Sequence, residues 1–387
     1  MNKVIVFRDF LLSRSETFIQ AQAESLQTFK PVYAGLRPAD PSLPITPDVL
    51  MTRATGVRAK VAALAYRLTG FAPQFHRALK AQNALLIHAH FAVDGAAALR
   101  MRSILNIPLI VSLHGYDVTT DDVIFAKTMA GRRYLAQRPA LFAEAARFLC
   151  ISQAIREKAI SRGFPQEKLI VHYTGIDCEL FAPRPEEAVA REPRTILFVG
   201  RLVEVKGCAY AIRALAELEK IEPDCKFVVI GDGPLRAELD QLASELGVEV
   251  AFLGAQPSSV VREWLARSRV LCVPSVTTER GEREGFGLSL IEAQAMGTPV
   301  VSSWSGGISE AVEHGKTGLL APERDSVTLA AHLERFISDE LFWRECSMQG
   351  RERVVQNFNL RRQTERLEEI YRQAIAAGDR RSSSRAE

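Results

Sequence analysis

The stretch EREGFGLSLIEAQAMGTPVV, residues 282–301, carries two carboxylates, Glu284 and Glu292, that lie eight positions apart. Gly285 and Gly287 stand between them. On one continuous helix, eight steps of about 100° would leave the two side chains about 80° apart, so they would be poor partners on one face. The glycines therefore favour an arrangement in which the two carboxylates belong to different local structures.

A strand, a loop and a helix account for this spacing. VLCVPS (270–275) predicts a buried strand, and residues 276–287 predict a polar, glycine-containing loop. LSLIEAQAM then has helical periodicity, and Gly297 stands where a helix commonly ends. Glu284 is thus predicted in the loop, and Glu292 about one turn inside the helix. There the two carboxylates can reach different parts of one extended ligand.

The start of such a helix is expected to bind an anion. Its backbone N–H groups lack helical partners, and the positive end of the helix dipole favours phosphate. A carboxylate can accept two hydrogen bonds from a vicinal diol, so Glu292 suits a ribose and Glu284 a second polyol. This is the outline of a nucleotide sugar. A solvated loop glutamate with a surface helix glutamate gives the same spacing, and the motif alone leaves both interpretations open.

The rest of the chain predicts two α/β domains. Short β-branched runs alternate with amphipathic segments on both sides of APRPEEAVAREPR (182–194), a linker by its prolines and mixed charge. Such alternation is typical of parallel sheets, whose ligands bind at the carboxyl ends of strands, and the cleft between two domains is the default site. The expected strands are 4–7, 84–91, 108–115, 148–152, 195–200, 226–231, 248–254, 270–275 and 298–303.

The composition is that of an ordinary globular protein. The chain has 387 residues, 47% of them hydrophobic and 25% charged, and its net charge of +3 is too small to indicate nucleic acid. The six cysteines are widely spaced without C-x-x-C, which predicts reduced, buried thiols in a cytoplasmic protein. The opening MNKVIVFRDF has too short an apolar run for a signal peptide, and no run approaches the roughly 18 residues of a membrane span.

GRLVEVKG places Arg201 and Lys206 just after an expected strand. Two cations at the carboxyl end of a strand can hold a diphosphate and stabilise its charge as it leaves. A basic pair in a surface turn is the alternative. The chain contains no Asp-x-Asp, the pair that binds a metal ion in many transferases. A transferase without it must neutralise a leaving diphosphate with side chains and helix dipoles, so no metal is expected.

These motifs, in this order, resemble the family-4 glycosyltransferases of the two-domain GT-B fold. The matching segments are EGFGLSLIEAQAMGTPVV with its E-x7-E, SGGISEAVEHGKTGLL, GRLVEVKG, VIGDGP and VHYTGID. The first half is similar to bacterial exopolysaccharide transferases of the colanic-acid type through SETFI, HAHFA and LHGYD. The resemblance implies two Rossmann-like parallel-sheet domains that face an inter-domain cleft.

The resemblance also implies an activity. It indicates retaining transfer from a nucleotide-diphosphate sugar to a glycan or lipid-linked saccharide acceptor in bacterial polysaccharide biosynthesis, with no cofactor required. By the same similarity Glu292 binds the ribose, Glu284 the donor sugar, and Arg201 with Lys206 the diphosphate. The other expected donor-site residues are Gly285, Phe286, Gly287 and Leu288. The residues expected to contribute to catalysis are His114, Glu284, Arg201 and Lys206.

The acceptor side is expected in the first domain. His114 ends PLIVSLHG and by the resemblance lines the cleft near the donor sugar; a packed strand-end histidine is the alternative. Many relatives carry two glycines in the first strand–helix loop, whereas RDFLLSRSET has none, so side chains of Arg14 and Ser15 are expected to replace those contacts, or acceptor binding differs. His88 and His90 share a strand face and are interpreted as a cleft-lining or packed pair rather than metal ligands.

The expected boundaries follow from the linker. Residues 1–183 form the acceptor-side domain, and a helix at about 358–377 packs back on it. Residues 184–357 form the nucleotide-sugar domain, and residues 378–387 form a disordered tail. Two other functions stay open at this point: a nucleotide-sugar epimerase of the same fold, and a catalytically silent binding member of a glycan-assembly complex.

The segment from Val49 to Val93 contains no Asp or Glu. Its basic residues are interleaved with apolar ones, a pattern that suits an anionic membrane surface but also a solvated helix face. Membrane contact would make a lipid-linked acceptor natural. The basic residues concerned are Arg53, Arg58, Lys60, Arg67, Arg77 and Lys80.

Overall fold

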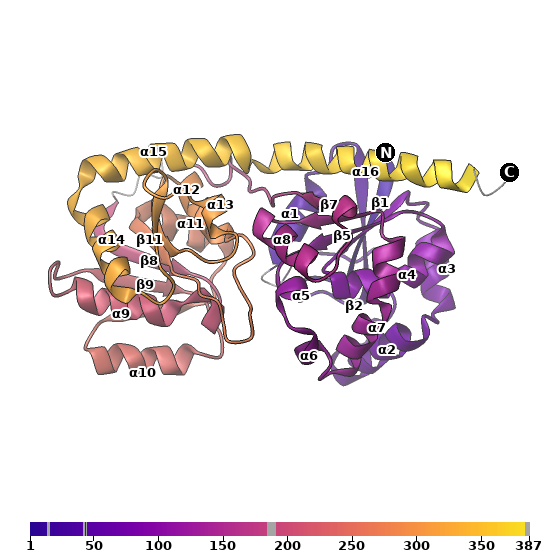
Figure 1. The fold of residues 1–387 in the computed structure, drawn as a ribbon, viewed down its shortest axis with the longest axis horizontal. Coiled ribbons are helices and arrows are strands. Elements are labelled where there is room, and N and C mark those ends of the chain that lie inside the picture. Colours follow the sequence, from indigo (N-terminus) through magenta and orange to yellow (C-terminus); the bar gives the residue numbers. More distant parts are fainter. Residues whose placement is uncertain (14–15, 42, 44, 184–190, 384–387) are drawn as a thin grey trace. The chain divides into compact units, whose positions relative to one another are not determined.

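The computed structural model describes residues 1–13, 16–41, 43, 45–183 and 191–383, with side chains up to Gly378. It divides into two compact units, Met1–Gly175 with the segment from Leu360 onward, and Ile176–Asn359 (Figure 1). The chain therefore enters the second unit earlier than the expected boundary at 183/184. The physical reason is backbone pairing, because the Ile176 amide donates to the Phe358 carbonyl at 2.9 Å and Ile176 bridges to Asn359.

The described part of the first unit contains a seven-stranded parallel sheet in the order β3-β2-β1-β4-β5-β6-β7. The strand order reverses direction between β1 and β4, which makes the carboxyl edge at these two strands the topological switch point of this sheet. The strands are β1 Asn2–Phe10, β2 Phe29–Arg37, β3 Val49–Leu50, β4 Leu86–His90, β5 Leu109–Leu113, β6 Arg147–Cys150 and β7 Leu169–Val171.

Helices cover both faces of the first sheet. Alternate residues of β1 point to opposite faces, so Val4 packs in the same cluster as Tyr371 of α16, whereas Ile5 packs in the large cluster under α4 and α7. The helices of this unit are α1 Thr17–Glu24, α2 Gly56–Thr69, α3 Pro73–Lys80, α4 Ala92–Leu105, α5 Tyr116–Thr119, α6 Asp122–Phe125, α7 Met129–Glu144, α8 Gln153–Ser161, the 3-10 helix Gln166–Lys168 and α16 Leu360–Ser383.

The C-terminal helix α16 belongs to the first unit although it is last in the chain (Figure 1). Leu367, Tyr371 and Ala374 are buried against the sheet. The helix runs to Ser383, so the disordered tail expected from residue 378 is wrong for residues 378–383, and residues 384–387 lie outside the described part.

The described part of the second unit repeats the architecture with six parallel strands in the order β10-β9-β8-β11-β12-β13. The switch point lies between β8 and β11. The strands are β8 Glu192–Val199, β9 Lys226–Ile230, β10 Val250–Gly254, β11 Ser268–Val273, β12 Val300–Ser303 and β13 Gly318–Ala321. The helices are α9 Cys208–Leu218, α10 Arg236–Leu246, α11 Ser258–Arg267, α12 Leu288–Ala295, α13 Ile308–Ala311, α14 Ser326–Ser338, α15 Glu340–Asn357 and the 3-10 helix Glu204–Lys206.

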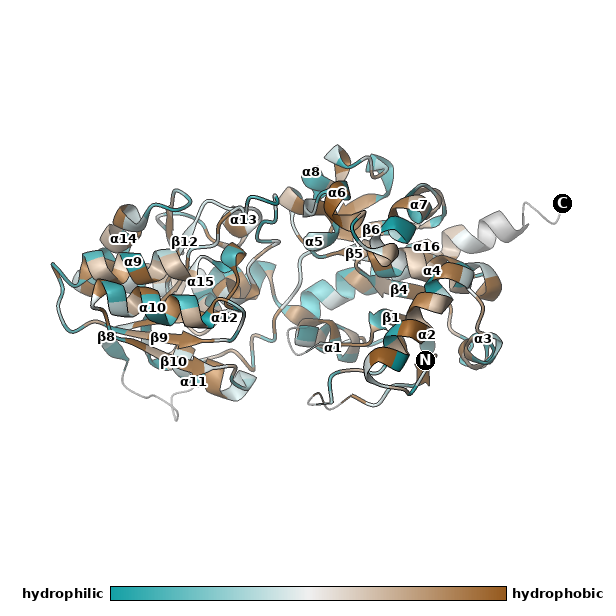
Figure 2. Cartoon of the chain, turned by 90° about the horizontal axis from the view of Figure 1, so that it is seen from below, coloured by the Kyte–Doolittle hydropathy of each residue, from teal (hydrophilic) through white to brown (hydrophobic). Residues whose placement is uncertain are grey.

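The predicted strand–loop–helix unit is confirmed. β11 ends at Val273, α12 begins at Leu288, and Gly297 follows the helix with a left-handed φ of +68°. In Figure 2 the strands β9 and β10, at one side of the sheet, are brown, whereas α9 and α10 carry both brown and teal residues, as expected for helices that cover one face of a sheet. All six cysteines are buried and free.

Candidate active site

The switch point of the second sheet brings two loops together. Arg201 and Lys206 follow β8, and Ser275 follows β11. The turn after Lys206 lies directly against the end of β11, because a Cβ atom built on Gly207 would stand 1.8 Å from the Pro274 carbonyl oxygen. Gly207 also has a left-handed φ of +68°, so both space and backbone conformation require glycine there.

Lys206 and Glu284 form an ion pair at this edge. The Lys206 Nζ lies 2.5 Å from Glu284 Oε2, and the Ser275 hydroxyl lies 3.3 Å from the same oxygen. The side chains of Lys206 and Glu284 are 22% and 13% exposed, so the pair is accessible to a ligand. Burial acts to raise the pKa of Glu284, but Lys206 and hydrogen bonds from Ser275 and Gly285 hold that pKa below its ordinary value.

The loop that carries Glu284 is fixed by its backbone. The Gly307 amide donates to the Glu284 carbonyl at 3.1 Å, and a Cβ on Gly306 would stand 1.9 Å from the same oxygen. Phe286 is 1% exposed and its ring packs edge-on against Phe358, so the ring is not available to a ligand. A second carboxylate, Glu323, accepts from the Thr277 amide and hydroxyl at 2.8 Å and anchors the start of the loop.

Helix α12 begins beside Glu284. Gly287 caps it with φ of +89°, and its Cβ position is 3.8 Å from the Glu284 Cγ. The first amides of α12, from Leu288 onward, have no carbonyl four residues earlier in a helix to pair with. Lys206, Glu284 and the start of α12 therefore lie together within this unit.

Glu292 lies one turn into α12 and is partly buried. Burial raises the pKa of Glu292 to about 7, against a smaller opposite effect of Lys206. Within the described part of the chain, its carboxylate has no hydrogen-bond or ion-pair partner. Arg201 is exposed, and its guanidinium is likewise without a partner among the described residues. Both groups offer hydrogen-bonding capacity that the protein does not use.

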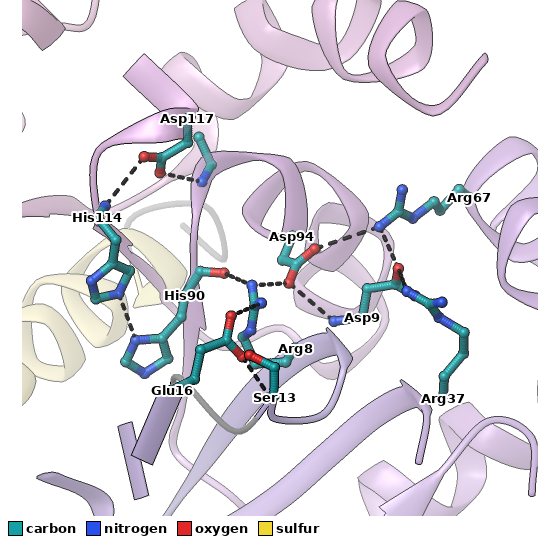
Figure 3. A network of polar contacts seen from close by, with 11 residues as sticks. Arg8, Asp9, Ser13, Glu16, Arg37, Arg67, His90, Asp94, His114 and Asp117 are labelled. Carbon is teal, nitrogen blue, oxygen red and sulfur yellow. Dashed lines mark hydrogen bonds and ion pairs between the residues drawn. The ribbon is translucent and has the colours of Figure 1, made fainter. Parts of the chain in front are cut away.

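The switch point of the first sheet carries a histidine pair. His90 ends β4, His114 follows β5, and His90 Nδ1 lies 3.0 Å from His114 Nε2 (Figure 3). Burial, with the neighbouring positive groups, lowers the pKa of both imidazoles well below the ordinary value, so both are neutral and one donates to the other. The Asp117 carboxylate accepts from the His114 amide at 3.2 Å and fixes the backbone of this turn.

Next to the pair lies a charge network that the sequence did not reveal. Arg8 donates to Asp94 at 2.7 Å, to Glu16 at 2.6 Å and to the His90 carbonyl at 3.0 Å (Figure 3). Behind it, Asp9 accepts from Arg37 at 2.8 Å and from Arg67 at 2.6 Å. Arg67 also lies 3.6 Å from Asp94, which joins the two halves.

The expectations for the first unit concerned Arg14 and Ser15 as acceptor contacts and His88 as a cleft-lining or packed residue. Arg14 and Ser15, expected to contact an acceptor, lie outside the described residues. His88 is packed, since its Nδ1 lies 2.6 Å from the Tyr371 hydroxyl and its Nε2 lies 2.7 Å from the Ser112 hydroxyl. Among the described residues, no group of three or more His, Cys, Asp or Glu side chains is placed to hold a metal ion.

The fold and the second-unit site are those of the GT-B glycosyltransferases: two Rossmann-like units, with basic side chains and a helix N-terminus at the carboxyl edge of the second sheet. The family model "Glycosyltransferase Family 4" matches residues 32–180, and "Glycosyl transferases group 1" matches residues 182–353. The D-inositol 3-phosphate glycosyltransferase of Corynebacterium aurimucosum is 31% identical over 318 residues, covering 75% of this chain and 72% of that protein. The chain belongs to the family-4 glycosyltransferases of GT-B fold.

Two other similar proteins carry names from exopolysaccharide biosynthesis. The amylovoran biosynthesis glycosyltransferase AmsK of Erwinia amylovora is 33% identical over 274 residues, and the putative colanic acid biosynthesis glycosyltransferase WcaL of Escherichia coli K12 is 34% identical over 278. Each alignment covers 70% of this chain, which spans only 65% and 66% of those proteins, about two thirds of their length.

The solved structure of Anabaena Alr3699/HepE in complex with UDP and glucose shares the fold. It aligns with a TM-score of 0.77 and 21% identity, over 96% of this chain and 99% of that one. Among the described helices, none combines the length and the apolar character that a membrane crossing requires.

Proposed function

We propose that this chain transfers a sugar from a nucleotide-diphosphate sugar to a glycan or lipid-linked saccharide in bacterial exopolysaccharide biosynthesis. The observation that carries the proposal is the edge of the second unit. There a lysine, two carboxylates and a helix start lie together, and Glu292 and Arg201 lack partners among the described residues. The choice of exopolysaccharide as the product rests on the similarity to AmsK and WcaL, which are named for amylovoran and colanic acid biosynthesis.

Each group on this edge has a role in holding the donor. Lys206 and Arg201 bind the diphosphate, and the amides at the start of α12 add neutral donors and the helix dipole. Glu284 accepts from hydroxyls of the donor sugar, next to Lys206. Glu292, deeper in the helix, accepts from the ribose diol. Because the cations come from the chain itself, the proposed site uses no metal to neutralise the diphosphate.

In the proposed step the bond between the anomeric carbon and the diphosphate oxygen breaks, and a bond forms from that carbon to an acceptor oxygen. Lys206, Arg201 and the α12 amides stabilise the negative charge that develops on the leaving diphosphate. The acceptor attacks from the face that the diphosphate leaves, so the anomeric configuration is kept, and the leaving phosphate oxygen takes the acceptor proton. His114 and His90, both neutral, offer hydrogen bonds but no charge on the first unit, where we place acceptor binding.

A donor screen tests the proposal. UDP-, GDP- and ADP-sugars are compared by thermal shift, with UDP-glucose included because HepE was solved with UDP and glucose. One donor should raise the melting temperature of the wild type, and Lys206→Ala and Glu292→Ala should abolish that rise. Lys316→Ala, whose exposed lysine pairs with Glu313, is the matched control and should behave as wild type. Stabilisation by no donor, or equal stabilisation of all four proteins, refutes the site.

Product analysis separates the rival functions. With the cognate donor, release of nucleoside diphosphate should require a saccharide acceptor, and the anomeric proton in the NMR spectrum of the product should show retained configuration. Acceptor-independent release would favour the epimerase. Donor binding without turnover would favour a silent binding protein. An inverted product would exclude the proposed proton transfer to the leaving phosphate.

We also propose that the α2 face of the first unit contacts an anionic membrane surface. Val57, Val61 and Leu68 follow helical spacing on α2, and Phe71 comes just after the Gly70 that ends the helix; their exposed fractions are 75%, 61%, 42% and 76%. The exposed basic residues of the same stretch of chain are Arg53 before α2, Arg58 and Lys60 in α2, and Arg77 and Lys80 in α3. Arg67 is not part of this face, because its guanidinium pairs inward with Asp9.

Vesicle sedimentation tests this contact. Wild-type protein should sediment with vesicles of phosphatidylglycerol and phosphatidylcholine but not with phosphatidylcholine alone, and replacement of the five exposed basic residues by Gln should abolish sedimentation. Added salt should weaken the binding, since the contact combines charge attraction with apolar burial. Sedimentation that survives the five substitutions, or none in the wild type, discards the contact.

A further inference from the structure

A cavity of about 280 Å³ opens between α2, α4 and α7 of the first unit. Each helix contributes one arginine to its wall: Arg67 from α2, Arg100 from α4 and Arg133 from α7. Neutral hydrogen-bonding side chains complete the polar lining, among them Ser103 and Gln137. No Asp or Glu of the described chain lines it. Three like charges around one small space repel each other unless an anion joins them.

Of the three arginines, only Arg67 pairs with a carboxylate among the residues that the structure describes. Arg67 pairs with Asp9 at 2.6 Å and lies 3.6 Å from Asp94, yet its Nε is buried and has no hydrogen-bond partner in the described structure. The Arg133 Nε donates to the Arg67 carbonyl at 3.2 Å, which places these two residues side by side. Arg100 is exposed at the mouth and has no partner among the described residues. The wall therefore presents guanidinium N–H donors that lack acceptors.

We propose that this cavity binds the phosphate group of a lipid. A phosphate offers several acceptor oxygens to guanidinium groups, each of which can bind two such oxygens at once, and its negative charge offsets the positive charges of Arg100 and Arg133. The volume is close to the lower end of the range for small-molecule sites, which suits a phosphate and its first attached atoms.

The wall itself indicates that an apolar tail accompanies the phosphate. Thr69 and Gly70 line the cavity, and their chain neighbours Leu68 and Phe71 are 42% and 76% exposed. Apolar side chains exposed beside an anion site can cover hydrocarbon. This assignment deepens the proposed membrane contact of α2, on which its tail part rests, and it does not depend on glycosyl transfer.

Calorimetric titration tests the site without a membrane. The probes are a short-chain phosphatidic acid below its micelle concentration and glycerol 3-phosphate, which has the phosphate but no tail. Wild-type protein should bind the phosphatidic acid, and the double variant Arg100→Gln/Arg133→Gln should bind it at least about tenfold more weakly, because charge-assisted hydrogen bonds are lost. Arg100→Gln alone, which removes a side chain without a partner and leaves the fold undisturbed, should lose part of the affinity.

The matched control removes two charges from the same helices outside the cavity. In Arg102→Gln/Arg132→Gln, the first substitution removes an α4 arginine that pairs with Glu144, and the second removes an exposed arginine of α7. This double variant should bind the phosphatidic acid as wild type does. Equal loss in both double variants, or loss in neither, overturns the site. Glycerol 3-phosphate that binds as tightly as the phosphatidic acid overturns the lipid assignment. Failure of vesicle binding with intact binding of the short-chain lipid refutes only the membrane contact.

Discussion

The two units have the same sheet topology, but the charged side chains at the switch point of the first sheet are paired with one another, whereas some of those in the second unit are not. Both sheets reverse their order next to the first strand of the unit, at β1 and β4 in one and at β8 and β11 in the other. In the first unit, Arg8 is enclosed by Asp94, Glu16 and a backbone carbonyl. In the second unit, one ion pair occupies the edge, and Glu292 and Arg201 have no partner in the described chain.

The difference teaches that topology alone does not select the reactive edge. In the first network three arginines form ion pairs with three carboxylates, so its charges balance. The residues are Arg8, Arg37, Arg67, Asp9, Glu16 and Asp94. A network of this kind fixes the shape of an edge but leaves little charge for a ligand. The second edge keeps unused donors and acceptors, so a ligand can complete it.

The largest expected effect breaks the first network. Asp94→Ala leaves Arg8 and Arg67 without a shared partner in a buried place, and we expect a loss of about 3–5 kcal/mol from the unfolding free energy of the first unit. Hydrogen exchange of the β1 and β4 amides in increasing urea measures it. Trp264, Trp304 and Trp343 are the three tryptophans and all belong to the second unit, so their fluorescence reports whether that unit is unaffected.

Asp122→Ala is the control for Asp94→Ala. Its carboxylate also pairs with an arginine, Arg138 at 2.6 Å, but it is 42% exposed, so we expect a cost of about 0–1 kcal/mol. Similar costs for the two variants would mean that the Arg8 network is no tighter than a surface pair, and the contrast between the two edges would fail.

The second effect tests the open edge. Lys206→Ala removes the cation beside Glu284, and we expect kcat for sugar transfer to fall about 10²–10³-fold, because charge on the leaving diphosphate is no longer stabilised. The partly exposed site can take up water in place of the side chain, so the melting temperature should change little. Lys206→Arg keeps the charge and should retain more activity than Lys206→Ala. A normal kcat in Lys206→Ala would mean that the edge of the second unit takes no part in catalysis, and the contrast with the first unit would fail.

The residues of the proposed donor site could be selected from the sequence because most of them are close together in the chain. Glu284, Gly287 and Glu292 fall within nine residues, and the strand–loop–helix pattern around them is visible in the sequence. What could not be predicted is the pairing of Lys206 with Glu284, 78 positions apart, and the contribution of Ser275. These depend on β8 and β11 being neighbours, which the order of residues alone does not give.

The first unit was less predictable for the same reason. Arg8 and Asp94 are 86 positions apart and Asp9 and Arg67 are 58 apart, so each residue by itself is only a charge near a strand or in a helix. Some elements also contradict local propensity. β2 contains Pro31 and Gly35, and α7 contains Pro139, yet packing on the sheet maintains both.

The third expected effect is a pH dependence of donor binding, caused by the unpaired Glu292 of the second unit. An ionised Glu292 accepts hydroxyl hydrogen bonds better than a neutral one, and its pKa is about 7. Affinity for the intact nucleotide sugar should therefore rise about tenfold between pH 6 and pH 8, as the ionised fraction does. Calorimetry in buffers of equal ionic strength measures it. Glu292→Gln should give a flat profile, and a profile that stays steep in this variant would assign the titration to another group.

The same group makes a prediction for the free protein. Its folded pKa lies above the ordinary value of 4.5, so the neutral carboxyl favours the folded state. That contribution is complete below about pH 4.5 and is lost as the pH rises through about 7. The unfolding free energy of the second unit, followed by tryptophan fluorescence in urea, should thus decline more steeply over this interval in wild type than in Glu292→Gln.

The smallest effect concerns the start of α12. Gly287 has φ of +89°, and a Cβ there would stand 2.8 Å from the Leu290 Cδ1, so Gly287→Ala should cost about 1–2 kcal/mol of stability. Gly247→Ala is the control, since Gly247 also has positive φ, +68°, but its Cβ would meet nothing within 4 Å. Both variants pay for the backbone conformation, whereas only Gly287→Ala displaces amides that face the proposed diphosphate. Weaker donor binding in Gly287→Ala alone would tie the helix start to the ligand, and equal donor binding in both would remove it from the site.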